Sequence, residues 1–199
     1  MIDRRSLIRN STAAGFGAVA LAAVSSGTEL AYGSAGSAST AGQPGGQQAG
    51  YPAHLSAEER RHLRIFDELD FEIFTHQEWD RLGESHARSI RVHWPDGHFT
   101  DGIDKHIADL AALFVWAPDT RILQHQFRLA NDQLTAVTGV MQGTFTKPMP
   151  DGKGGFIQPT GKAYALPMAT VGIWNKRNTM DEEYLFWDNQ TFYAQIGLG

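Results

Sequence analysis

Asp188, near the C-terminal end of the sequence, stands among aromatic residues at the spacing of one strand face. Alternation through a predicted strand over 183–196 puts four other side chains on its face: Tyr184, Phe186, Gln190 and Phe192. A carboxylate packed among aromatic rings loses hydration, which raises its pKa. Such a group can act as a general acid or base near neutral pH. The ordinary alternative is that Asp188 caps a hairpin or pairs with an arginine.

A histidine in another predicted strand is a second candidate for chemistry. His125 lies within 121–130, where alternation places it on one face with the apolar residues Leu123, Phe127 and Leu129. A neutral imidazole there could hydrogen-bond a substrate carbonyl or share a proton with Asp188. A single histidine on an apolar face is more often part of the core, so both interpretations stay open.

A third candidate, His93, ends a short predicted strand over 89–94. Arg91 shares its face, and Trp94 follows at a Pro-Asp-Gly turn. We predict Arg91 and Trp94, with Phe127, Phe186, Tyr184 and Gln190, as residues that contact a substrate. The larger expectation for any tryptophan is core packing.

The sequence does not predict a metal site. It contains no cysteine, so thiolate ligands are excluded. No HExxH motif occurs, and four histidines show no helical i, i+4 pairing with a carboxylate partner: His86, His93, His98 and His106.

Length and charge restrict the class of protein. The chain has 199 residues and a net charge of −5, with 42% hydrophobic and 20% charged residues. These values suit one globular domain with additional segments. A mildly acidic chain without a basic cluster gives no support for nucleic-acid binding.

The first part of the chain is predicted to direct export. Arg4 and Arg5 precede a weakly apolar, Ala/Gly-rich run, which resembles a twin-arginine (Tat) signal over residues 1–35. Residues 36–54 are rich in Gly, Ser, Ala and Gln and are predicted to form a flexible linker. The domain then covers 55–199, and the expected location is periplasmic or extracellular.

Hydrophobic periodicity places helices first and strands second. Capping signals and three- to four-residue spacing predict a long helix from Ser56 to about Phe74, a short helix after Thr75, and a third ended by Pro118. Four longer strands follow, at 121–130, 133–147, 163–174 and 183–196. This order predicts an α+β fold in which three helices pack on a curved antiparallel sheet.

Four local stretches resemble the SnoaL-like polyketide (ester) cyclases of the nuclear-transport-factor-2-like superfamily. They are VHWPDG (92–97), ANDQLTAVTGVMQGTF (130–145), PTGK (159–162) and EYLFWDNQTFYAQIGL (183–198). The resemblance extends from about residue 55 to the end. It implies a cone with an internal cavity. The hairpin at 175–179 departs from the family's Asp-Gly-Lys-Ile pattern, and the export signal is unusual beside cytoplasmic cyclases.

The resemblance also implies chemistry. The position matching Asp188 is the acid/base residue of those cyclases, which close a ring by intramolecular aldol reaction without metal or cofactor. We therefore expect an acid/base enzyme (cyclase, isomerase or dehydratase) acting on a small apolar or aromatic carbonyl compound. The alternative is an exported ligand-binding or association module of the same fold. A homodimer through the sheet is expected, with Leu185, Trp187 and Tyr193 as the residues to test.

Overall fold

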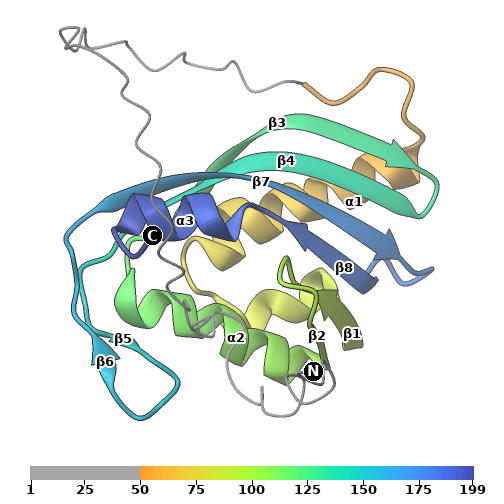
Figure 1. The fold of residues 1–199 in the computed structure, drawn as a ribbon. Coiled ribbons are helices and arrows are strands. Elements are labelled where there is room, and N and C mark those ends of the chain that lie inside the picture. The colour runs from red at the N-terminus through yellow and green to blue at the C-terminus, as the bar shows by residue number, and fades with distance from the viewer. Residues whose placement is uncertain (1–49) are drawn as a thin grey trace, which may run out of the picture.

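The computed structural model describes residues 50–199 (Figure 1). The predicted signal (1–35) and the linker residues 36–49 lie outside the described residues, so the export prediction stays a prediction. Within residues 50–199, none of the helices has the length and apolar character needed to cross a membrane.

The first helix begins with the capping signal that the sequence predicted, whereas the short helix after Thr75 has no side-chain cap, and two helical segments differ in type from the prediction. Ser56 and Glu59 form a capping box at the start of the first helix. The predicted long helix changes to a π-helical turn after Glu68, and the predicted short helix is a 3₁₀ segment. The helical segments are α1 (Ala57–Glu68), η1 (Leu69–Phe74), η2 (Trp79–Glu84), α2 (Ile103–Trp116) and α3 (Asn189–Ile196).

A six-stranded sheet forms the second layer, with strand order β2-β1-β8-β7-β4-β3. All neighbouring strands are antiparallel except β1 and β8, which run parallel. A separate two-stranded ribbon pairs β5 with β6. The strands are β1 (His86–His93), β2 (Phe99–Asp101), β3 (Arg121–Asn131), β4 (Leu134–Thr144), β5 (Met149–Pro150), β6 (Phe156–Ile157), β7 (Ala163–Trp174) and β8 (Met180–Phe186).

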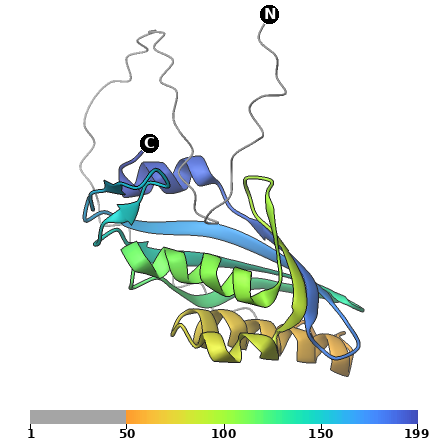
Figure 2. The ribbon, with the colours of Figure 1, turned by 90° about the horizontal axis from the view of Figure 1, so that it is seen from below.

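The helices α1 and α2 lie on one side of the curved sheet (Figure 2). They pack against its inner face, and the core runs between the two layers. Figure 1 shows α3 lying beside the long strand β7. The predicted α+β class, with helices on a curved and mostly antiparallel sheet, is confirmed.

Two β-bulges in β3 change which residues face the core. The pairing of β3 with β4 shifts between Ile122 and His125 and again between His125 and Phe127. Each bulge adds one residue to β3 and so changes the phase of its alternation. Gly139 lies opposite, where an added Cβ would approach the Gln124 carbonyl oxygen at 3.3 Å. His125 therefore faces inward while Phe127 faces outward, and the prediction that they share a face is wrong.

The predicted strand over 183–196 is a strand only in its first part. The strand β8 ends at Phe186, and α3 follows. Asp188 is the N-cap of α3, and its side chain accepts a hydrogen bond from the Gln190 amide. Gly197 ends the helix in a left-handed conformation, with φ 81°. An aspartate before the segment and a glycine after it are helix boundary signals.

The outer sheet face carries large apolar residues in contact with solvent. They include Leu123, Phe127, Leu129 and Phe186. Leu185 and Trp187, which we expected in a dimer contact, lie instead on the inner side, where both line the cavity described below. The homodimer stays a prediction.

Candidate functional site

A small cavity lies between the helices and the inner face of the sheet. Its volume is about 50 Å³. By volume it has room for only a few water molecules. The lining is mostly apolar, with side chains such as Leu110, Leu113, Met141 and Leu185. The polar groups in its wall are therefore the candidates for chemistry.

Asp70 is the carboxylate that joins the cavity to a hydrogen-bonded network. It lies in the π-helical turn η1 and is only 7% exposed. Its Oδ2 is 2.7 Å from Nε2 of His125, which is fully buried. The other ring nitrogen of His125, Nδ1, is 2.8 Å from Oδ1 of Asp67. The two acids are three residues apart, so one helical face presents both to the same histidine.

The network continues to a buried arginine. Nε of Arg128 donates to Asp67 Oδ1 at 2.9 Å, and its Nη1 donates to the His125 carbonyl at 3.1 Å. The Tyr51 hydroxyl also donates to Asp67. Burial acts to raise the pKa of Asp67, but the hydrogen bonds from His125, Arg128 and Tyr51 outweigh it, so that its pKa lies below the ordinary value. Asp67 is thus held as an anion that orients His125.

Asp70, which lines the cavity, and its partner His125 have shifted pKa values. Burial lowers the pKa of His125, but hydrogen bonds to Asp67 and Asp70 outweigh this effect and raise its pKa to about 9. Burial raises the pKa of Asp70 above the ordinary range, against the opposing hydrogen bond from His125. With a carboxylate at each ring nitrogen, His125 is an imidazolium that donates to both. Asp70 is an acid whose proton affinity is increased where it meets the cavity.

We expect stability to fall on the alkaline side because of His125. Its folded-state pKa of about 9 lies above the value of about 6.5 of an unfolded chain. The extra stability is thus complete below pH of about 6.5 and disappears as pH rises through about 9. Urea unfolding at a series of pH values measures this. In His125→Gln the decrease across that interval should be smaller, and an identical decrease in both proteins would contradict the assignment.

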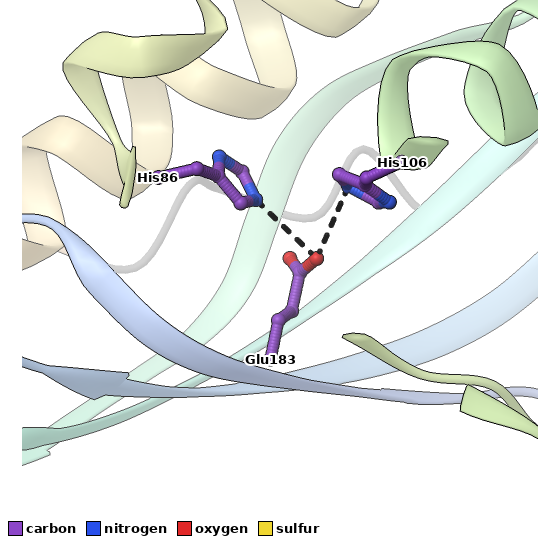
Figure 3. Close-up of side chains that lie close together, drawn as sticks. All are labelled: His86, His106 and Glu183. Atoms are coloured by element: carbon purple, nitrogen blue, oxygen red, sulfur yellow. Dashed lines mark hydrogen bonds and ion pairs between the residues drawn. The ribbon is translucent and has the colours of Figure 1, made fainter. Parts of the chain in front are cut away.

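A second set of polar residues in the cavity wall comes from three separate elements of the fold. His86 begins β1, His106 lies in α2 and Glu183 lies in β8; all three are buried and line the cavity. The Oε2 atom of Glu183 is 3.4 Å from Nε2 of His86 and 3.5 Å from Nε2 of His106 (Figure 3). We call these three residues the His-His-Glu cluster. Two imidazoles and a carboxylate are a donor set that can hold a metal ion.

Asp188 does not lie in this cavity. It is exposed at the N-cap of α3, where it accepts hydrogen bonds from the Gln190 amide and the Thr191 hydroxyl. These bonds hold its pKa below the ordinary value. The predicted burial and raised pKa of Asp188 are therefore wrong. Gln190 is in the exposed first turn of the same helix, not on a strand face.

Three predicted residues, Arg91, His93 and Tyr184, lie on the outer face of β1 and β8, where they contact other side chains of that face. Nε of Arg91 donates to the Asp101 carboxylate at 2.7 Å. His93 stacks on Tyr184, with ring centroids 4.0 Å apart, and its Nε2 is 3.1 Å from Oε2 of Glu182. The structure therefore brings His93 and Tyr184 together, but away from the cavity.

The remaining predicted contacts divide between the two faces. Phe127 and Phe186 are 67% and 52% exposed, and with Asp188 they line a shallow outer groove. Trp94 is buried and lines the cavity, with its indole N–H donating to Thr100 Oγ1 at 3.2 Å. Of the nine predicted site residues, Trp94 and His125 are the ones placed on the inner side.

Sequence reasoning missed the acids of the inner face, although signals for two of them were present. Asp70 lies four residues after Phe66 and four before Phe74, on the apolar face of the predicted helix. Glu183 alternates with the buried Leu185 in β8. A charged residue at a core position of a helix or strand is rare unless it is paired, so each position indicated a buried polar site.

Comparison with solved structures supports the fold. A proposed SnoaL-like polyketide cyclase from Jannaschia sp. CCS1 superposes with a TM-score of 0.63 and 18% identity, covering 73% of this chain and 97% of the other. The proposed polyketide cyclase IdmH from Streptomyces antibioticus gives 0.59 and 20% identity, covering 69% and 99%. The chain thus has the fold of the nuclear-transport-factor-2-like proteins, and the SnoaL-like structures are among its structural neighbours.

A third neighbour carries a different name. It is a protein from Catenulispora acidiphila with a ketosteroid isomerase-like fold, solved in complex with trimethylamine, with a TM-score of 0.54 and 13% identity over 69% of this chain and 93% of the other. No protein-family model matches the chain, and no curated protein matches it either. At these identities the likeness establishes the fold, and the activity must be argued from the cavity.

Proposed function

We propose that this chain is an acid/base enzyme that removes and returns a proton on a small, largely apolar carbonyl compound bound in the cavity. The observation that carries the proposal is the placement of Asp70, a buried carboxylate in an apolar cavity wall with a raised pKa and a hydrogen bond to His125. A carboxylate that is sequestered from water and has a raised pKa is suited to general base catalysis.

Asp70 would take the proton from the carbon next to the substrate carbonyl. The resulting enolate either receives a proton at another carbon, which is isomerisation, or attacks a second carbonyl, which is aldol ring closure. In the second case Asp70 returns its proton to the new alkoxide, so the proton count balances. His125 donates to Asp70 throughout and is fixed by Asp67 on its other side.

The size of the cavity restricts the substrate. Pockets for drug-sized ligands hold about 300–1,000 Å³, far more than the cavity of about 50 Å³ found here. Met168 and Trp187 line both this cavity and the outer groove, so they form the wall between the two. A substrate larger than a few heavy atoms would have to displace these side chains. We therefore propose a small substrate.

Deuterium exchange tests the proposal without knowledge of the natural substrate. A panel of small ketones and diketones is incubated with the protein in D₂O, and loss of the proton signal next to the carbonyl is followed by NMR. The proposal predicts exchange faster than in buffer for at least one compound that binds. Binding without faster exchange would instead support the alternative, a ligand-binding module of the same fold.

A buried hydroxyl in the cavity wall gives a specific prediction about ligand binding. Thr170 is 1% exposed, lines the cavity, and among residues 50–199 its Oγ1 has no hydrogen-bond partner. Such a hydroxyl can donate to the substrate oxygen. Thr170→Val should weaken binding of an active ketone by about tenfold, because one hydrogen bond is lost, while stability is unchanged or increased. Calorimetric titration and urea unfolding measure the two effects; loss of stability with unchanged binding would contradict the role.

A further inference from the structure

The ligand atoms of the His-His-Glu cluster are spaced so that they could bind one metal ion. The carboxylate oxygen Oε2 of Glu183 lies 3.4 Å and 3.5 Å from the two Nε2 atoms, and all three ligand atoms lie within 4.8 Å of one another. Zinc–nitrogen bonds of about 2.0–2.1 Å with tetrahedral angles separate ligand atoms by about 3.4 Å. The two separations from Glu183 match that spacing and are long for direct hydrogen bonds.

A hydrogen bond on the far side of its ring orients His86 toward the cluster. Ser85 Oγ is 2.8 Å from Nδ1 of His86 and 3.1 Å from the Leu82 carbonyl oxygen. With Ser85 donating to that carbonyl, its oxygen can accept the proton of Nδ1. Nε2 would then offer its lone pair to an ion beside Glu183, as in metal sites where the other ring nitrogen donates to a nearby acceptor.

His106 completes the donor set. It is 2% exposed, and its Nε2 is the atom that faces Glu183. Among the described residues its Nδ1 has no hydrogen-bond partner. Two imidazoles and a carboxylate thus meet in a buried space, and a cation at their centre would satisfy all three groups.

We propose that His86, His106 and Glu183 bind one divalent transition-metal ion, for which Zn²⁺ is the best fit, with the remaining coordination position open to the cavity. Three protein ligands with one free position are typical of catalytic rather than structural zinc sites. All three ligands line the cavity that Asp70 also lines. If the proposed function is correct, an ion there would polarise the substrate oxygen while Asp70 takes the proton.

This inference revises the expectation of no metal from the sequence. That expectation rested on the absence of an HExxH motif and of helical i, i+4 pairing between a histidine and a carboxylate. The cluster is instead assembled from a strand, a helix and a second strand, with Glu183 far along the chain from both histidines. Spacing rules for local motifs do not detect such a site.

The test measures metal binding directly and does not depend on turnover. The untagged full chain is treated with a chelator, dialysed, and titrated with Zn²⁺ by calorimetry near pH 7.5. We expect about one ion bound per chain. Glu183→Gln should weaken the affinity by about a hundredfold or more, and Ser85→Ala by about 10–100-fold, because it removes the group that orients His86.

Glu182→Gln is the matched control. Glu182 is adjacent in β8 but lies on the opposite sheet face, where it pairs with His93 at 3.1 Å. Glu182 and His93 also form a histidine–glutamate pair, but among the described residues they are not part of a three-residue ligand group. The affinity of the Glu182→Gln variant for Zn²⁺ should equal that of the unchanged protein. Equal weakening in both variants, or no saturable binding in the unchanged protein, would overturn the proposal.

A spectroscopic measurement covers the case in which Glu183→Gln fails to fold. Co²⁺ bound to the unchanged protein should give the intense visible absorption of a four-coordinate site, and Zn²⁺ should abolish it. Absence of that spectrum refutes the site without any variant. Asp70→Asn separates the two proposals, because it should keep metal binding and lose proton exchange. Metal binding without exchange activity in the unchanged protein would leave the site standing and refute the enzyme.

Discussion

Asp70→Asn should reduce the rate of substrate proton exchange by about 10²–10⁴-fold, the usual contribution of a positioned general base. Asparagine has nearly the same shape, and its side-chain oxygen can still accept the hydrogen bond that His125 now gives to Asp70. What it loses is the ability to take a proton. The effect should therefore fall on turnover, while ketone binding measured by calorimetry changes little.

Asp188→Asn is the control for this prediction. Asparagine is as good an N-cap as aspartate, so α3 should be preserved. Because Asp188 lies outside the cavity, exchange rates should match those of the unchanged protein. This pair of variants compares the acid chosen from the sequence with the acid found in the cavity. A large loss in Asp188→Asn and none in Asp70→Asn would refute the proposed mechanism.

Asp67→Ala should lower the free energy of unfolding by about 3–5 kcal/mol, because it leaves buried cations without their counter-ion. Arg128 and His125 have side chains that are 2% and 0% exposed, and both bond to this carboxylate. Alanine offers neither charge nor an acceptor. Urea unfolding near pH 7 measures the loss.

Asp101→Ala provides the comparison with an exposed pair. Asp101 accepts two hydrogen bonds from Arg91, at 2.7 Å and 3.0 Å, on the outer face of the sheet. Exposed ion pairs contribute about 0–1 kcal/mol, so this variant should be almost as stable as the unchanged protein. Similar losses in the two variants would indicate that burial of the Asp67 network contributes little.

The order of elements could be predicted because hydrophobic period and turn residues are local signals. The strand at 163–174 has the predicted bounds, and the capping box of Ser56 starts α1 as expected. The last predicted strand was wrong after Phe186 because an aromatic-rich sequence alternates well enough to resemble a strand. There the boundary signals of Asp188 and Gly197 were the better guide.

The candidate site was harder to predict because its geometry depends on tertiary pairing. The bulges in β3 reverse the face on which Phe127 lies relative to His125, and a rule based on strict alternation cannot anticipate them. Glu183 meets His86 and His106 only because β1 and β8 run parallel and α2 crosses the same face. The resemblance to the cyclases indicated the cone but pointed to an acid outside its cavity.

The bulges in β3 restrict the sequence changes that this strand can accept in evolution. Substitutions along β3 alter one face at a time, because each side chain belongs to one side. Loss of a single residue between Ile122 and Phe127 would do more, since it would remove one of the two bulges and turn the following part of the strand over. Hydrophobic side chains would then enter the interior where Arg128 now lies. Variation in this strand should therefore proceed by replacement and keep its length constant.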